Sequence, residues 1–430
     1  MECLPIPGAT HIILLSRYRR SRQNAPMPIN ALPLLALSAC TLLGSPAGVA
    51  GNPETAGIVL KLKISYTLNG LATAQEGQNW PQDLWERIRR GFRLAEVDPV
   101  LTRRHERWYA ARAEYLQRAI ERSHPYLYHI VDEVEKRGMP MEIALLPLIE
   151  SAFDPMAQSP KQAAGIWQFI PSTGRVFGLQ QNAWYDGRRD VLAATRAALD
   201  YLQVLHRQFG SWELALAAYN CGEGCLARGL ARNRARGLST AYAALPLPTE
   251  TRHYVPKLLA VRNLVRDPQA AGLALQAVEN EPYFVQVKID QPMPIRQAAK
   301  LADISLEEFL ALNPAFRRRV IHTDTRGVLL LPADKVEIFH HNLQKKDPQG
   351  DGLQLYQARK GESVKGIAGR FGVSLEWLKE HNPLKASRGK LLTDQVLYVP
   401  MTAKSTAARL ARAEPGMGGK EGSAKRTGDT

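Results

Sequence analysis

The sequence predicts a mainly α-helical domain, residues 85–268, followed by two small α+β modules over about residues 280–334 and 353–401. Two observations lead to this fold class: helical periodicity with few strand signals in the first part, and an internal repeat in the second. The length of 430 residues accommodates two or three domains of about 100–200 residues each. The apolar fraction of 45% is high enough for buried cores, which argues against a largely disordered chain.

Several segments carry the helical prediction. An apolar stripe at spacing i, i+3, i+4 and i+7 predicts an amphipathic helix. Its members are Leu127, Ile130, Val131 and Val134. The run Met141–Glu150 is apolar on nearly all sides and is expected to be buried. Asp190 is the expected N-cap of a helix that ends near Gly210, and two more helices are expected over residues 212–219 and 251–265.

The repeat defines the two modules. Ser305–Pro314 recurs as Ser374–Pro383, and the residues just upstream match without a gap. Each copy ends in a short strand-like run before proline, Val328–Pro332 in the first and Val396–Pro400 in the second. Each module is therefore expected to fold as strand, helix, helix, strand.

Glu150 is the first candidate for chemistry. It follows an apolar run made of Leu145, Leu146, Leu148 and Ile149. Helix geometry places apolar side chains around its carboxyl group, and such surroundings disfavour the anion of a carboxylic acid. An acid that keeps its proton near neutral pH is suited to general-acid catalysis. The same run also fits a glutamate exposed near a helix end, so the residues alone leave both interpretations open.

Four short motifs occur in order from this glutamate onward. They are Glu150–Pro155, Gly165–Thr173, Ala218–Gly222 and Glu250–Val255. Together they resemble the lytic transglycosylases of the soluble lytic transglycosylase family. The resemblance implies a lysozyme-like helical fold that cleaves the glycan of bacterial peptidoglycan.

The resemblance also implies a chemistry that uses no water. One glutamate, here Glu150, protonates the oxygen of the β-1,4 bond between N-acetylmuramic acid and N-acetylglucosamine. As a base it then accepts the proton of the sugar's own 6-hydroxyl, which closes to a 1,6-anhydro product. No cofactor or metal is expected. A two-carboxylate mechanism would need a partner, and the nearest candidate, Asp154, is expected to be a cap or a surface charge. The alternatives are a hydrolytic muramidase on the same substrate and a non-catalytic peptidoglycan-binding scaffold.

Substrate-binding residues follow from the resemblance, position by position. They are Ser159, Gln168, Tyr219, Asn220, Glu250 and Tyr254. Tyr254 matches a tyrosine whose hydroxyl bonds the catalytic carboxyl group, and Glu250 matches a residue that faces the stem peptide. Cys221 departs from the small residue usual at its position. Trp167 and Phe169 fit either the core or a platform for a sugar ring.

The second module, Tyr356–Pro400, resembles a LysM module, a family that binds glycans containing N-acetylglucosamine. Its expected glycan-binding residues are Gly361, Glu362, Ser363 and Asn382. The first module keeps Asn313–Pro314 but has Ile289–Pro292 in place of the corresponding turn. It is therefore expected either to be structural or to bind glycan poorly.

The N-terminus predicts export. Basic residues precede an apolar stretch, Ile29–Ala39, that is too short to span a bilayer. Leu37–Cys40 matches the lipobox of bacterial lipoproteins, in which the cysteine receives the lipid. We therefore expect a signal peptide over residues 1–40, a membrane anchor on Cys40 and a tether over residues 41–84. The expected location is the periplasmic side of the outer membrane of a Gram-negative bacterium.

The net charge indicates which classes of molecule the protein binds, and the cysteines leave two interpretations. The balance of 56 Lys+Arg against 41 Asp+Glu gives +15, which favours an anionic partner. No zinc-finger spacing, RNA-binding signature or basic helix with interleaved aromatics supports nucleic acid. Peptidoglycan and the membrane are thus the expected partners, and the sequence identifies no protein partner. Cys221 and Cys225 fit a local disulfide or two free thiols, and residues 402–430 are expected to be disordered.

Overall fold

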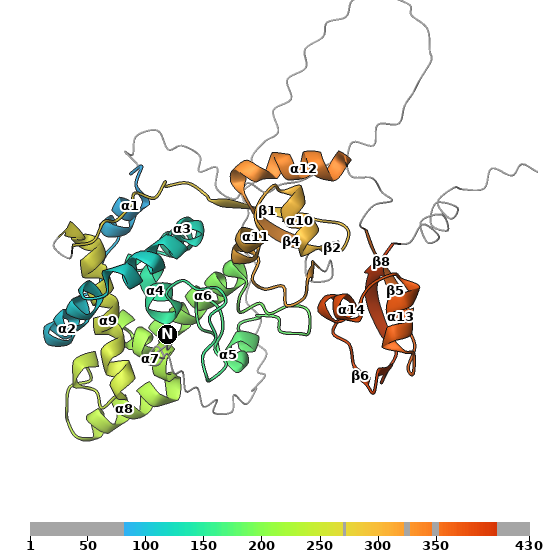
Figure 1. The fold of residues 1–430 in the computed structure, drawn as a ribbon. Helices are drawn as coiled ribbons and strands as arrows, with labels where there is room; N and C mark the ends of the chain where they lie inside the picture. The colour runs from blue at the N-terminus through green and yellow to red at the C-terminus, as the bar shows by residue number, and fades with distance from the viewer. Residues whose placement is uncertain (1–80, 270–271, 322–326, 346–351, 402–430) are drawn as a thin grey trace, which may run out of the picture. The chain divides into compact units, whose positions relative to one another are not determined.

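The structure is a computed structural model that describes residues 81–269, 272–321, 327–345 and 352–401 (Figure 1). The expected signal peptide with Cys40, almost all of the expected tether and the expected disordered tail lie outside the described residues. Within the described ranges, no helix is long and apolar enough to cross a membrane. In the same ranges, no group of three or more His, Cys, Asp or Glu side chains is placed to hold a metal ion.

The first part of the described chain is helical. Its α-helices and 3-10 helices (η) are α1 (Leu84–Arg90), α2 (Pro99–Ala110), α3 (Ala113–Lys136), η1 (Met141–Leu145), α4 (Leu146–Ser151), α5 (Pro171–Val176), α6 (Val191–Phe209), α7 (Trp212–Cys221), α8 (Glu223–Ala235), η2 (Tyr242–Ala244) and α9 (Thr249–Arg266). Among the described residues, the first β-strand, β1, begins at Phe284. The predicted helical domain is therefore confirmed.

Local signals account for the ends of α6. The Asp190 side chain accepts a hydrogen bond from the backbone N–H of Ala193, which satisfies one of the donors left free in a first helical turn. Gly210 ends the helix with φ +81°, a left-handed conformation that favours glycine. The predicted start and end of this helix are both confirmed.

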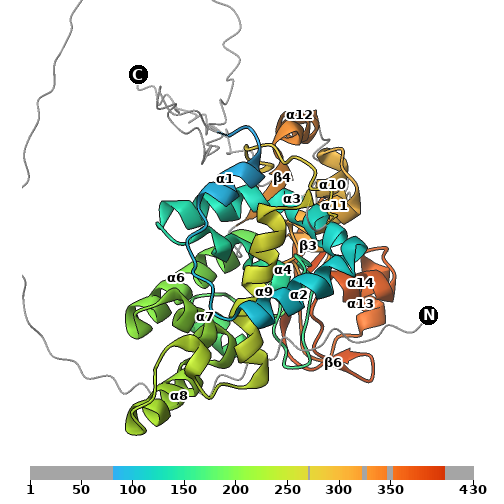
Figure 2. The same ribbon diagram turned by 90° about the vertical axis from the view of Figure 1, so that its left-hand side faces the viewer.

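The core of the helical domain forms around α3, α6, α7 and α9. The predicted stripe on α3 is fully buried, and the run over η1 and α4 as far as Glu150 is buried. Helix α9 packs against α2, α4 and α7, and both views show it running beside α2 and α7 (Figure 1, Figure 2). Helix α9 is therefore placed to bring its side chains to the end of α4.

The two modules have the predicted strand–helix–helix–strand order. The elements of the first module are β1 (Phe284–Lys288), β2 (Met293–Pro294), α10 (Ile295–Leu301), α11 (Leu306–Leu312), β3 (Val320–Ile321), β4 (Val328–Pro332), η5 (Ala333–Lys335) and α12 (Val336–Lys345). Those of the second are β5 (Leu353–Ala358), α13 (Val364–Arg370), α14 (Leu375–His381), β6 (Ala386–Ser387), β7 (Lys390–Leu391) and β8 (Gln395–Pro400). In each module the outer strands pair antiparallel, β1 with β4 and β5 with β8.

The asparagine of the repeated Asn-Pro pair has the same structural role in both modules. In the first module the Asn313 amide donates to the Leu330 carbonyl at 2.8 Å, and its oxygen accepts from the Leu330 N–H at 2.8 Å. In the second module Asn382 makes the same pair of bonds to Tyr398, at 2.9 and 2.7 Å. Each asparagine therefore fastens the end of the second helix to the last strand of its module.

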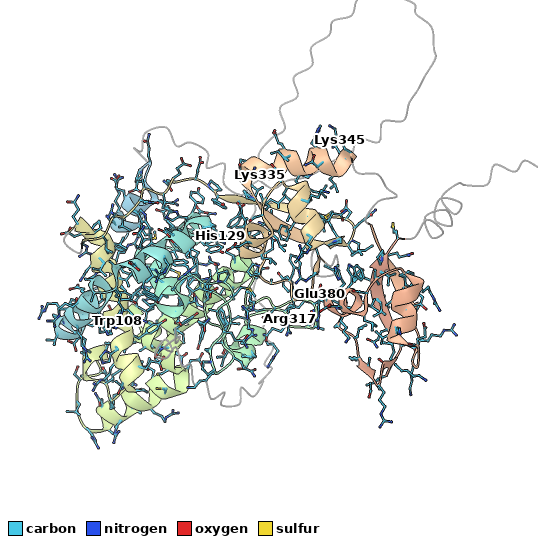
Figure 3. All side chains as sticks on the ribbon, in the orientation of Figure 1. Trp108, His129, Arg317, Lys335, Lys345 and Glu380 are labelled. Atoms are coloured by element: carbon cyan, nitrogen blue, oxygen red, sulfur yellow. The ribbon has the colours of Figure 1, made fainter. Side chains whose placement is uncertain are left out.

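The first module extends beyond its expected end at residue 334. Helix α12 follows η5, and its Phe339 side chain is fully buried in the hydrophobic core of this module. Figure 3 labels Lys335, the residue just before this helix, and Lys345, its last residue. The helix lies outside the repeat, so a comparison of the two copies gives no sign of it.

Candidate functional site

The site is built around Glu150 at the end of α4. The side chain is only 8% exposed, although it stands one residue before the end of the helix. The helix stops because Ala152 and Phe153 adopt left-handed conformations, with φ of 51° and 57°. Two successive non-glycine residues in this region are uncommon, and such strain tends to persist where a site requires it. The helix therefore ends at Ser151, one residue after Glu150, and the chain changes direction at Ala152 and Phe153.

Tyr254 on α9 is the hydrogen-bond partner of the Glu150 carboxyl group. Its hydroxyl donates to Oε1 of Glu150. Burial, and after it the neighbouring charge of Glu150, raises the pKa of Tyr254 well above its ordinary value. The phenol therefore stays protonated and remains a donor to Glu150. The contact that the resemblance implied for these two residues is present.

Tyr219 and Asn220 stand at the end of α7, and Tyr219 lies near enough to Glu150 to be affected by its charge. The Tyr219 hydroxyl donates to the Trp167 carbonyl at 2.8 Å, and burial followed by the charge of Glu150 raises the pKa of Tyr219. The Asn220 amide donates to Glu250 at 3.4 Å and accepts from the Thr251 hydroxyl at 2.8 Å. These bonds join α7 to the start of α9 beside the site.

Gln168 is buried, and its amide nitrogen donates to the Gly165 carbonyl at 2.8 Å. Gly165 has φ +79°, and a Cβ at this position would lie 2.0 Å from the Arg188 carbonyl oxygen. Only glycine fits there, so this part of the motif shapes the backbone. Trp167 and Phe169 are buried at 0% and 3% exposure, which assigns both to the core.

Ser159 and Asp154 form local bonds in the loop after α4. The Ser159 hydroxyl accepts from the Ala163 N–H at 3.1 Å, across the turn formed by residues 159–163. Asp154 accepts from the Met156 N–H at 2.8 Å, as expected of a capping carboxylate. The second carboxylate associated with the site is instead Glu250. Its negative charge helps to raise the pKa of Tyr254, and it opposes the lowering of the pKa of Lys257 by burial.

The sequence interpretation missed Lys257. Its ammonium group donates to the Ile149 carbonyl at 3.0 Å, directly beside Glu150. A signal was present, because Glu250, Tyr254 and Lys257 follow the spacing i, i+4, i+7 and therefore share one face of α9. The two cysteines nearby, Cys221 and Cys225, are free thiols in this structure.

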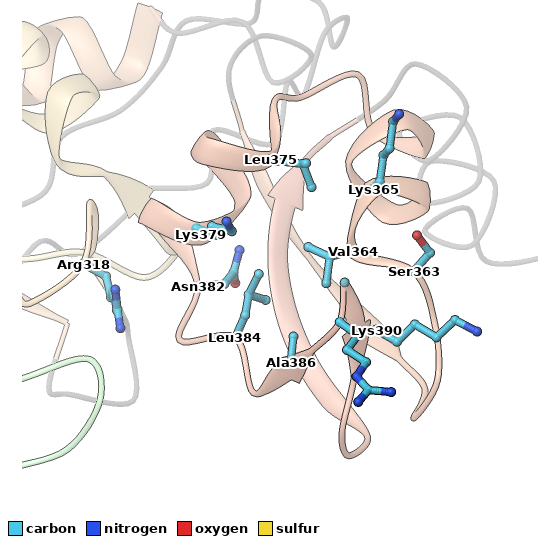
Figure 4. A pocket seen from close by; sticks show the side chains of 12 residues that line it. Arg318, Ser363, Val364, Lys365, Leu375, Lys379, Asn382, Leu384, Ala386 and Lys390 are labelled. Carbon is cyan, nitrogen blue, oxygen red and sulfur yellow. The ribbon is translucent and has the colours of Figure 1, made fainter.

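Eleven residues of the second module line a cavity, and the remaining lining residue is Arg318 of the first module (Figure 4). Its lining includes Ser363, Lys365, Leu375, Lys379, Asn382, Arg388 and Lys390. Two of the four expected glycan-binding residues, Ser363 and Asn382, are thus part of it. Gly361 adopts φ +87°, and the Glu362 carboxylate accepts from the Arg359 N–H at 2.7 Å and from the Tyr356 hydroxyl at 2.8 Å. Both shape the turn that precedes α13.

Three family models match the chain in the order of its domains. Residues 128–241 match the Transglycosylase SLT domain. Residues 283–347 match the LysM-like domain of lytic transglycosylase MltD, and this match includes α12. Residues 356–400 match the LysM domain.

Similar proteins of known name agree with these domain matches. The chain is 36% identical over 355 residues, 80% of its length and 76% of the relative's, to membrane-bound lytic murein transglycosylase D of Escherichia coli K12. It is 32% identical over 119 residues, 26% of its length and 18% of the relative's, to soluble lytic murein transglycosylase of Salmonella typhimurium. The solved 70 kDa soluble lytic transglycosylase of Escherichia coli aligns at 22% identity and a TM-score of 0.29 over 39% of this chain and 30% of that one. The chain belongs to the family of membrane-bound lytic murein transglycosylase D, enzymes that act on peptidoglycan.

Proposed function

We propose that Glu150 is the single acid and base with which this lytic murein transglycosylase cleaves the β-1,4 bond between N-acetylmuramic acid and N-acetylglucosamine. The observation that carries the proposal is the buried carboxyl group of Glu150 held by the hydroxyl of Tyr254. A positioned acid with few solvent contacts is suited to proton transfer to a glycosidic oxygen. The four ordered motifs support the same assignment.

The proposed reaction returns Glu150 to its starting state. The protonated carboxyl group gives its proton to the glycosidic oxygen, and the bond from that oxygen to the anomeric carbon breaks. The resulting carboxylate takes the proton from the 6-hydroxyl of the same muramic acid, whose oxygen bonds to the anomeric carbon. The products are a free 4-hydroxyl and a 1,6-anhydro end, and no water is consumed.

The neighbours of Glu150 have separate proposed roles. Tyr254 keeps the carboxyl group in place through both proton transfers, because its phenol remains a donor. Asn220 and Glu250 form a polar pair beside it, which we propose contacts the substrate. Ser159 and Gln168 bond to their own loops, so their proposed contribution is the shape of the sugar site.

Product analysis tests this mechanism. Peptidoglycan digested by the protein should yield muropeptides lighter by one water, with no reducing end, when analysed by mass spectrometry. Reducing ends would instead indicate hydrolysis, for which Glu250 is the carboxylate to examine as a water activator. The Glu250→Gln variant adds a second test, because it should largely abolish product formation if Glu250 activates a water and should still form anhydro products in a transglycosylase.

We propose in addition that the cavity of the second module binds glycan strands. The lining includes four basic side chains of this module, Lys365, Lys379, Arg388 and Lys390, together with apolar ones such as Leu375. Apolar groups suit the faces of sugar rings, and cations suit the carboxylates that peptidoglycan carries. The module would then keep the enzyme on its polymeric substrate.

We also propose that Cys40 carries a lipid that anchors the protein to the outer membrane, facing the periplasm. The proposal rests on the lipobox Leu37–Cys40, and the E. coli relative is named as membrane-bound. Metabolic labelling with a fatty acid should mark the wild type and not Cys40→Ser. The variant should also move from the membrane fraction to the soluble fraction.

A further inference from the structure

The first module has a segment that corresponds to the cavity lining of the second. In the second module, Leu384 and Ala386 follow the repeated Asn-Pro pair and line the cavity. Ala315 and Arg317 stand at the same spacing after the Asn-Pro pair of the first module. A glycan could bind this segment only if it were open to solvent. Ala315 and its neighbour Phe316 are instead buried, at 3% and 9% exposure.

The helical domain covers this segment with the loop of residues 182–188. The helical domain and the first module belong to one compact unit of the chain. The Asp186 N–H donates to the Ala315 carbonyl at 2.9 Å. The Arg317 N–H donates back to the Trp184 carbonyl at 2.8 Å. The 182–188 loop therefore bonds to the backbone of the first module at the place where the second module has its cavity.

Two aromatic side chains add to this contact. Tyr185 and Phe316 are paired as in an antiparallel β-ladder, and their ring centroids lie 5.7 Å apart. The Tyr185 ring packs against the hydrophobic core of the first module. Its hydroxyl donates to Asp190, the N-cap of α6 in the helical domain. Tyr185 thus contacts both the first module and the helical domain.

The same loop holds a buried ion pair that reaches the sugar site. Nε and Nη2 of Arg188 donate to the Asp186 carboxylate at 2.9 and 2.7 Å. Burial alone would raise the pKa of Asp186, but the hydrogen bonds and the charge of Arg188 lower it. Nη1 of Arg188 donates to the Gln162 carbonyl at 2.6 Å and to the Phe169 carbonyl at 3.2 Å. Arg188 therefore joins two points of the loop of residues 159–169 to the 182–188 loop.

The backbone of the 159–169 loop is strained at two positions. Gln162 and Gln168 adopt left-handed conformations, with φ of 61° and 50°. Residues other than glycine rarely adopt this conformation, and it persists where the surrounding contacts fix it. The bonds from Arg188 are contacts of this kind, because they end at the carbonyl of Gln162 and at the carbonyl just after Gln168.

We propose that the first module positions the sugar site of the helical domain. The module binds the 182–188 loop, and through Asp186 and Arg188 this loop keeps the 159–169 loop in its strained form. The inference rests on the proposed function, in which the 159–169 loop shapes the sugar site. It gives the first module a role in substrate binding by the helical domain, whereas the second module is the one proposed to bind glycan strands.

The test combines two measurements on the full chain: steady-state kinetics with soluble peptidoglycan oligosaccharides, and hydrogen exchange of residues 159–169 without substrate. Phe316→Ala and Tyr185→Ala weaken the contact between the module and the 182–188 loop from its two sides. Arg188→Gln removes the bonds from that loop to the 159–169 loop. Thermal unfolding of each variant gives its loss of stability.

Two control variants change the same parts of the protein outside this network. Ile338→Ala shortens an exposed apolar side chain of α12, in the first module. Arg87→Gln removes a buried arginine of α1 that bonds a carboxylate of α3, as Arg188 bonds Asp186. The second control shows what the loss of a buried ion pair does to the helical domain when the sugar site is not involved.

We expect Phe316→Ala, Tyr185→Ala and Arg188→Gln each to raise KM about 5- to 10-fold while kcat stays within about 2-fold of wild type, because the bond from Tyr254 to Glu150 is kept. Hydrogen exchange of residues 159–169 should become faster in all three variants. Both controls should keep the KM and the exchange of the wild type.

Wild-type KM and exchange in Phe316→Ala would overturn the proposal, because the first module would then have no effect on the site. If Phe316→Ala fails to fold, Tyr185→Ala is judged by the same criterion. Equal changes in Arg87→Gln would also overturn it, because they would show a general effect of lost stability. The proposed function is judged separately, by whether anhydro products form and whether Glu150→Gln abolishes them, and the exchange measurement does not depend on that result.

Discussion

The hydroxyl of Tyr254 donates to the carboxyl group of Glu150 across 104 residues of sequence. The bond joins the last turn of α4, a short helix that ends in a strained turn, to the long helix α9. Lys257, one turn further along α9, donates to the carbonyl just before Glu150. Helix α9 thus contacts the acid at its carboxyl group, through Tyr254, and at the backbone beside it, through Lys257. Each contact can be tested by changing one residue.

Tyr254→Phe should lower kcat/KM by about 10- to 100-fold, the range expected for a hydrogen bond to a charged group. The loss should appear mainly in kcat, because the bond is made to the reacting carboxyl group. Turnover of soluble peptidoglycan oligosaccharides measures it. Tyr242→Phe is the control: this buried phenol donates to the Thr251 carbonyl, so its removal should cost stability and leave kcat near wild type. Equal rates for Tyr254→Phe and wild type would remove Tyr254 from the mechanism.

Gly165→Ala should destabilise the helical domain by about 3 kcal/mol or more, because the added Cβ would meet the Arg188 carbonyl at 2.0 Å. Gly178→Ala is the matched comparison. Gly178 has nearly the same φ, +76°, but nothing lies within 4 Å of its added Cβ, so only the backbone cost of about 1 kcal/mol applies. Urea unfolding of both variants gives the difference. Similar losses of stability in the two variants would mean that the backbone around Gly165 shifts and relieves the clash.

The stability of the helical domain should fall as pH drops from about 6.5 to about 4. Nε2 of His105 lies 3.0 Å from Nδ1 of His253, and burial, followed by the charge of His253, lowers the pKa of His105 to about 4. The unfolded chain, with a histidine pKa near 6.5, therefore binds more protons than the folded one in this range, and protonation favours unfolding.

Urea unfolding at pH 7 and pH 5 measures this effect. His105→Gln should lose less stability than wild type between the two pH values. His341→Gln, at an exposed position on α12, should behave like wild type. An unchanged pH dependence in His105→Gln would contradict the assignment.

Charge reversal in the cavity of the second module should weaken retention on peptidoglycan. Lys379→Glu combined with Lys390→Glu is expected to reduce binding about 10-fold at physiological ionic strength and less in high salt. Sedimentation with intact sacculi, in a Glu150→Gln background that leaves them undigested, measures it. Lys360→Glu with Lys385→Glu makes the same charge change outside the cavity lining and should bind as the parent. Equal losses in both pairs would indicate a general charge effect.

Local patterns predicted much of the fold. The apolar stripe of α3, the cap at Asp190 and the end at Gly210 depend on residues within one or two helical turns, and all three are confirmed. The apolar run before Glu150 predicted a buried segment, but for Glu150 itself the local pattern left burial and exposure both open, and the structure shows the side chain buried.

Long-range contacts explain what the sequence did not predict. The bond from Lys257 to Ile149 joins residues 108 apart, and no local pattern specifies it. The close approach of the Arg188 carbonyl to Gly165, the glycine to which the Gln168 amide donates, also joins segments that are separate in the sequence. Phe339 and its helix α12 lie outside the repeat, so the repeat could not reveal them.

The most direct test of the central claim is the activity of Glu150→Gln on intact sacculi, beside Asp154→Asn. Glutamine keeps the size and the polar contacts of the side chain but can neither give nor take the proton. We predict that Glu150→Gln releases anhydromuropeptides at least about 10³-fold more slowly than wild type while it still sediments with sacculi, and that Asp154→Asn stays near wild type. Release of anhydromuropeptides by Glu150→Gln at the rate of the wild type would contradict the account.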